Sequence, residues 1–144
     1  MLRDRVKEYY LEKDYNCAET TLHCINDEYG LGLTDEQIKL ASGFGAGMGC
    51  GQTCGVLCAG IAALGKLLVD QRAHNTEGFG DICAAYVGAF QAKLGSLACE
   101  ELVKTYKKEE TRCLETVLLA ADLFCPAPGG EALRAAGGVD PYWR

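Results

Sequence analysis

SGFGAGMGCGQTCGVLCAGIAALG, residues Ser42–Gly65, begins as a loop with glycine at every second position and continues as an apolar segment of small residues. Glycine at this density lets the backbone take positive φ values and lets other groups approach closely. The apolar part predicts a helix over residues 52–69. Cys50, Cys54 and Cys58 lie four residues apart, so we expect their sulfurs to form a stripe over the first turns of this helix.

The N-terminal end of a helix carries partial positive charge and unpaired N–H groups, which favour thiolate over thiol. Residues 40–65 include no charged side chain, so we expect this run to be interior. Its length approaches that of a membrane span, but eight glycines and three polar residues, Ser42, Gln52 and Thr53, interrupt it. We therefore interpret the run as buried core.

Composition and charge restrict the class of protein. The chain has 144 residues, enough for one domain with a sizeable core of its own. With 49% hydrophobic and 24% charged residues it is globular in composition rather than disordered. A net charge of −6 argues against nucleic acid or an anionic membrane surface as a partner, because both are bound through Lys and Arg patches.

Nine cysteines are the unusual feature of the composition. Met1 is followed by the charged sequence LRDRVKEYY instead of an apolar signal segment, so we expect the chain to be cytoplasmic. Structural disulfides are rare in that compartment, where clustered cysteines more often serve metal or redox chemistry. An odd number of cysteines also fits poorly with a complete disulfide framework.

The expected fold is all-α, because no segment alternates apolar and polar residues with the two-residue period of a strand. Asp14 and Asn16 are the candidates to cap a helix that Gly30 ends, and Thr34 with Gln37 forms a capping box. Residues 1–125 are predicted to form one helical domain, and the Pro/Gly-rich residues 126–144 an extension packed on it, with a short helix near 131–136. About seven helices are expected around the central 52–69 helix, over residues 3–13, 17–29, 35–41, 52–69, 79–94, 97–108 and 112–124, with a polar loop at 71–78.

Four cysteines, Cys17, Cys54, Cys99 and Cys113, each fall at or near the N-terminus of an expected helix. If these ends converge, the sulfurs meet among positive helix ends, which lowers thiol pKa values and suits metal or Fe–S ligation. Other chemistries lack their motifs. There is no C-x-x-C-H for haem, no C-x-x-C for thioredoxin-like exchange or a zinc ribbon, and no phosphate-binding glycine motif.

The segments YNCAE, GFGAGMGCGQTCG, GSLACEEL and TRCLETVLLAA resemble the redox-active proteins named for a C…GCAxxG…C…C pattern, over about residues 15–121. The resemblance implies a small, mostly helical protein whose signature residues are Cys17, Cys54, Cys99 and Cys113. A related module in split-Soret-type cytochromes implies electron-transfer partners and a cluster. The chain departs from the pattern after Cys54, with Val56 in place of alanine and Ala59 in place of the closing glycine, which follows one position later.

Our leading hypothesis is a redox or electron-transfer protein that binds an iron–sulfur cluster. The ligands would be Cys17, Cys54, Cys99 and Cys113, with Cys50 and Cys58 as auxiliary ligands or neighbouring sulfurs. Two alternatives stay open: a thiol/disulfide redox protein without metal, and a module that binds zinc or another soft ion without turnover. Expected partners are an electron-transfer protein and, from the small-residue helix faces and the aromatic C-terminal tail, a second copy of the chain. Whether the protein is an enzyme is left open.

Overall fold

The structure is a computed structural model that describes residues 2–124 of the chain. The all-α prediction is confirmed: within these residues there is no strand, and the β-type pairs are two isolated bridges. Short 3₁₀ and π segments accompany the helices, among them η1 (Leu2–Arg5), η2 (Glu8–Glu12), η3 (Lys39–Phe44), η4 (Gly47–Gly51) and η5 (Ala73–Asn75). The α-helices are α1 (Cys17–Tyr29), α2 (Asp35–Ile38), α3 (Gly55–Leu68), α4 (Phe79–Leu94), α5 (Cys99–Tyr106) and α6 (Leu114–Leu123).

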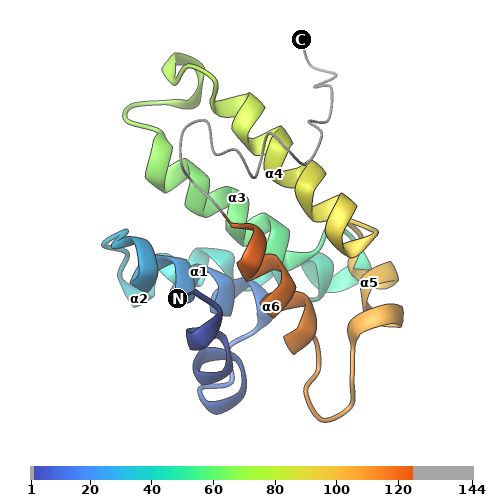
Figure 1. Cartoon of the computed structure of the whole chain (residues 1–144). Coiled ribbons are helices and arrows are strands. Elements are labelled where there is room, and N and C mark those ends of the chain that lie inside the picture. Colours follow the sequence, from blue (N-terminus) through green and yellow to red (C-terminus); the bar gives the residue numbers. More distant parts are fainter. Residues whose placement is uncertain (1, 125–144) are drawn as a thin grey trace.

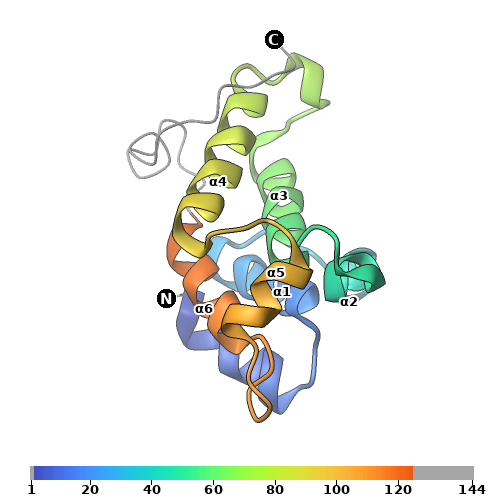
Figure 2. The ribbon, with the colours of Figure 1, turned by 90° about the vertical axis from the view of Figure 1, so that its right-hand side faces the viewer.

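Helix α3 is the central helix, as predicted, and packs against α1, α4 and α6 (Figure 1). Helices α3 and α4 run side by side in opposite directions, joined by the connection at residues 69–78 (Figure 2). Helix α6 packs on both α4 and α1, and α5 lies beside α6 at the end of the molecule where α3 begins. This arrangement brings the N-terminal ends of several helices into one region.

The apolar half of the glycine- and cysteine-rich run forms the core. Val56, Ala59 and Leu64 of α3 are almost completely buried. Gly60 is required here because the ring of Tyr86 from α4 lies against its Cα, where a Cβ would collide with it. Close packing of α3 on α4 therefore depends on a residue without a side chain.

The prediction that the whole uncharged run is interior is wrong for its first half. Leu40 is 83% exposed, Met48 is 47% exposed, and Cys50 is also exposed. This half forms η3, η4 and irregular turns, whose backbone polar groups need water or local partners and so stay at the surface. Apart from Ala41 and Gly47, burial in this run begins at Cys54, where the regular α3 hydrogen bonds begin.

Several helix ends agree with the predictions. Asn16 caps α1 in a capping box with Glu19, and Gly30 ends it in the left-handed conformation. The capping box of Thr34 and Gln37 is present, but α2 changes after Ile38 into the 3₁₀ segment η3.

The predicted starts of three helices, and the type of the predicted N-terminal helix, differ from the structure. The predicted starts at 52, 97 and 112 are each two or three residues early, because the residues before Gly55, Cys99 and Leu114 are extended or in turns. The predicted helix over residues 3–13 is present as one continuous helical segment over residues 2–12, but its turns are 3₁₀ in η1 and π in η2. The predicted extension 126–144, including the helix near 131–136, lies outside the described residues. No helix in the described part of the chain is long and apolar enough to cross a membrane.

Candidate functional site

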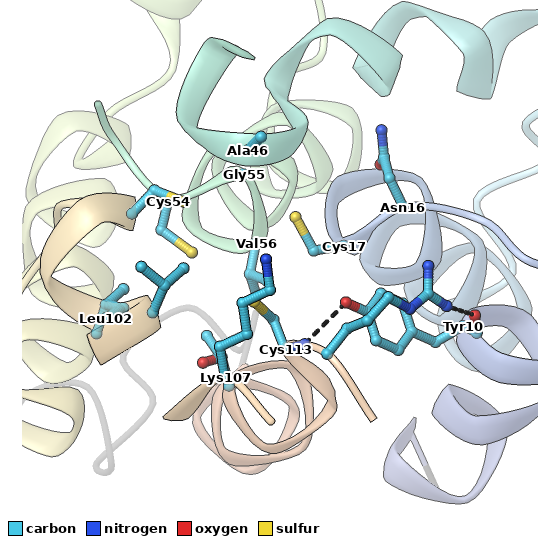
Figure 3. Close-up of a pocket in the computed structure, with 14 residues that line it drawn as sticks. Tyr10, Asn16, Cys17, Ala46, Cys54, Gly55, Val56, Leu102, Lys107 and Cys113 are labelled. Atoms are coloured by element: carbon cyan, nitrogen blue, oxygen red, sulfur yellow. Dashed lines mark hydrogen bonds between the residues drawn. The ribbon is translucent and has the colours of Figure 1, made fainter. Parts of the chain in front are cut away.

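Four helix N-termini meet around one cavity, and each brings a signature cysteine. Cys17 and Cys99 are the first residues of α1 and α5, while Cys54 and Cys113 occupy the N-cap positions of α3 and α6. All four line a cavity of about 200 Å³ (Figure 3). This volume exceeds the roughly 150 Å³ of an engineered cavity that accommodates benzene. The convergence expected from the positions of these cysteines is therefore present in the fold.

A backbone bridge joins the segments that carry Cys54 and Cys99. The Cys54 N–H donates to the carbonyl of Leu97 at 2.8 Å, and the Cys99 N–H donates to the carbonyl of Gln52 at 2.6 Å. These bonds form the isolated bridge between Thr53 and Ala98. They keep both segments extended up to the start of α3 and α5, so the two cysteines enter the cavity side by side.

Tyr10 and Arg112 fasten Cys113 to the N-terminal segment. The Cys113 N–H donates to the Tyr10 hydroxyl at 3.0 Å, and Arg112 donates to the Tyr10 carbonyl at 2.6 Å. The Arg112 guanidinium lies 4.3 Å from the centre of the Tyr10 ring and also pairs with Asp14 at 3.2 Å. Because Asp14 lies just before α1, these contacts hold Cys113 close to the helix end that carries Cys17.

Two glycines allow the glycine loop and α3 to lie directly against the cysteines. A Cβ on Gly55 would be 2.6 Å from the carbonyl oxygen of Phe44 and 3.1 Å from Sγ of Cys17. A Cβ on Gly47, whose φ is +60°, would be 2.6 Å from Cβ of Cys99. Real side-chain contacts are not this short, so these positions admit only glycine without a shift of the backbone.

Burial raises the pKa values of the thiols and the positive helix ends lower them, and the effect of burial is the larger. It raises the pKa of Cys54 to about 12 and also raises the pKa values of Cys17, Cys99 and Cys113. Hydrogen bonds from the backbone at Ala46 and Val56 lower the pKa values of Cys17 and Cys54, but by less than burial raises them. The predicted lowering of the thiol pKa values is therefore wrong.

This protonation pattern predicts the order in which the thiols react. In reduced protein stripped of metal by a chelator, we expect iodoacetamide to alkylate exposed Cys50 first, and the buried Cys24 and Cys54 last. Because thiolate is the reactive form, alkylation of Cys54 should accelerate only as the pH rises toward 12, whereas unfolded thiols titrate near about 8.5. Peptide mass spectrometry of timed samples measures each rate, and urea-unfolded protein is the control. Equal rates at Cys54 and Cys50 in the folded protein would contradict this order.

The structure separates the auxiliary cysteines from the cavity. Cys50 is exposed in η4, outside α3, so the expected stripe of three sulfurs is wrong; its Sγ lies 3.6 Å from the Gly47 carbonyl oxygen. Cys58 is half-buried on α3, and neither it nor Cys50 lines the cavity. Cys24 is buried in the core and Cys83 is half-buried on α4, both away from the cavity. Cys125 lies outside the described residues.

Tyr10 and Lys107 belong to the site but were not singled out from the sequence. Tyr10 is predicted above only as part of the 3–13 helix, and Lys107 only as part of the 97–108 helix. Both line the cavity, and the side chain of Tyr10 is 4% exposed. No local signal in the sequence marks Tyr10, because its contacts are with residues about 100 positions away.

A family model for proteins described as "Putative redox-active protein (C_GCAxxG_C_C)" matches residues 15–125. The chain belongs to this family. The match spans the signature cysteines, so membership in this C_GCAxxG_C_C family supports a general redox role for the chain. Comparisons with curated proteins and with solved structures find no match.

The departures from the C_GCAxxG_C_C pattern are accommodated by the fold. Val56, in place of the usual alanine, lines the cavity and is 1% exposed. Ala59, in place of the closing glycine, is fully buried, and the glycine one position later accepts the Tyr86 ring. Both departures therefore change packing in and beneath the cavity and remove none of its thiols.

The donor set around the cavity suits a soft metal or an Fe–S group. Its lining includes four thiols, and none of the described residues that line it is acidic or a histidine. Iron–sulfur clusters are held by cysteine thiolates, and thiolates select soft metal ions. No three His, Cys, Asp or Glu side chains in residues 2–124 lie close enough together to hold a metal ion. The four signature cysteines of the described residues therefore line a shared cavity without forming a three-donor metal site.

Proposed function

We propose that this protein is an electron-transfer protein that holds an iron–sulfur cluster through Cys17, Cys54, Cys99 and Cys113. The observation that carries the proposal is the convergence of these four thiols on one cavity with no acidic group among its described lining residues. Thiolate donors at the ends of four helices match the ligand type and number that such clusters use. When bound, the cluster would supply one-electron chemistry.

The protonation of the thiols favours a bound group over free dithiol chemistry. Buried thiols with raised pKa values are protonated at neutral pH and are poor nucleophiles for disulfide exchange. A bound cation deprotonates a coordinating thiol outright, because its charge compensates the thiolate. The site thus favours ligation by a positively charged centre over a metal-free disulfide switch.

The spread of the sulfurs favours a cluster over a single zinc ion. Four sulfurs that each lie about 2.3 Å from one zinc ion must crowd around a point. The described residues offer no set of three donors that close together. A group that fills a cavity of about 200 Å³ and accepts thiolates at its periphery fits this arrangement better.

Residues around the sulfurs would tune the bound group. The backbone at Ala46 hydrogen-bonds to Cys17, that at Val56 hydrogen-bonds to Cys54, and the Tyr10 hydroxyl interacts with Cys113. Hydrogen bonds to ligand sulfurs stabilise negative charge and are among the factors that set the potential of Fe–S groups. These residues would therefore favour the more reduced state.

The proposal is tested by a visible absorption spectrum with iron and acid-labile sulfide analysis on protein purified without oxygen. We expect a brown protein with both iron and sulfide, bleached by dithionite. Colourless protein that cannot be reconstituted with iron and sulfide would overturn the cluster. Zinc in stoichiometric amount would support the soft-ion alternative, and a loss of free thiols on mild oxidation would support the disulfide alternative.

A further inference from the structure

Lys107 brings a positive charge into the sulfur cavity. It ends α5, where its N–H donates to the carbonyl of Val103 at 3.2 Å, and its side chain lines the cavity. In Figure 3 this side chain points into the cavity that the signature cysteines line. The ammonium group therefore brings its charge to the site of the sulfurs.

The neighbouring cations have other partners. Lys104 pairs with Glu101 at 3.1 Å, and Lys108 pairs with Glu115 at 3.4 Å. Arg112, the other cation that lines the cavity, pairs with Asp14. Lys107 forms no ion pair with a carboxylate in residues 2–124.

The cavity needs such a charge when its thiols are ionised. Four thiolates bring four negative charges into a partly closed space, and none of the described lining residues is acidic. Repulsion among these charges grows as water is excluded. Lys107 lines the same cavity as the four thiols, so its positive charge lies beside the space in which this negative charge develops.

We propose that Lys107 is the charge-compensating residue of this site: its ammonium group stabilises negative charge on the sulfurs and on the group they hold, and so favours the reduced state of that group. The redox part rests on the proposed function, whereas the effect on the thiols does not. Reduction adds one electron from an external one-electron donor. Lys107 keeps its proton, and no bond to it forms or breaks.

The first test measures the thiols without a bound group, in Lys107→Gln and in Lys108→Gln as the matched control. Both variants remove one positive charge at adjacent positions, but Lys108 does not line the cavity. At neutral pH, with metal chelated, we expect iodoacetamide to alkylate Cys99 and Cys113 about threefold to tenfold more slowly in Lys107→Gln. Lys108→Gln should match the unmodified protein, and circular dichroism checks that both variants fold.

The second test measures the reduction potential of reconstituted protein by dithionite titration. Lys107→Gln should lower the ratio of reduced to oxidised protein at a fixed potential about tenfold, which is about 59 mV for one electron. Lys107→Glu should lower the reduction potential further, and Lys108→Gln should leave the potential unchanged.

The two tests separate this proposal from the cluster proposal. Slower alkylation in Lys107→Gln alone, in protein that never binds iron, would support Lys107 as the compensating charge and overturn the cluster. Equal alkylation in Lys107→Gln and Lys108→Gln would overturn the role of Lys107, whatever the protein binds. A potential that does not change between these two variants in loaded protein would overturn it as well.

Discussion

Cys54→Ser is expected to reduce bound iron and sulfide to below about a tenth of the wild-type content in protein purified or reconstituted without oxygen. Loss of a neighbour of a ligand already costs about 10- to 100-fold in metal affinity, so loss of a ligand should cost at least as much. A serine hydroxyl is also a harder and more weakly acidic donor than a thiol. Iron and sulfide analysis with the visible spectrum measures the result.

Cys58→Ser is the matched control. Cys58 is on the same helix one turn further along and does not line the cavity. We expect it to keep its colour and its iron, as we expect of Cys50→Ser. Helical content measured by circular dichroism shows whether either variant has lost its fold. If Cys58→Ser loses as much iron as Cys54→Ser, or if Cys54→Ser keeps its iron, the assignment of ligands is wrong.

The fold could be predicted from local chemistry wherever a short segment decides its own structure. The capping box of Asn16 and Glu19 and the left-handed Gly30 fix α1 from within the segment, and its bounds agree with the predicted 17–29. The same holds for α4, which Gly95 ends. Prediction was less accurate where contacts with distant residues decide the local structure. Residues 52–54 and 97–99 pair with each other, so α3 and α5 begin later in the chain than predicted.

The candidate site was predictable in its sulfurs and less so in its surroundings. Cysteine position relative to helix starts is a local property, and it identified four thiols that do share a cavity. The net effect on their pKa values depends on burial, which only the packed structure determines. Tyr10 and Lys107 enter the site through contacts between segments far apart in the chain, and such contacts leave no pattern in the sequence.

Gly47→Ala is expected to lower the free energy of unfolding by more than about 2 kcal/mol and to impair loading of the site. Its positive φ alone costs an alanine about 1–2 kcal/mol. The added Cβ would also meet Cβ of Cys99 and the backbone nitrogen of Gln52, both at 2.6 Å. To relieve these contacts, the glycine loop must move away from the start of α5, and this displaces Cys99.

Gly49→Ala separates the two causes. Gly49 has a similar φ of +73° in the same loop, but nothing lies within 4 Å of the position of its Cβ. We expect it to lose about 1 kcal/mol and to keep its iron. The loop already holds Ala46 and Met48 at φ of +55° and +60°, so a left-handed backbone does not by itself require glycine here. Urea unfolding and iron content should therefore differ between the two variants, and equal losses would show that backbone conformation, rather than contact with Cys99, selects glycine at position 47.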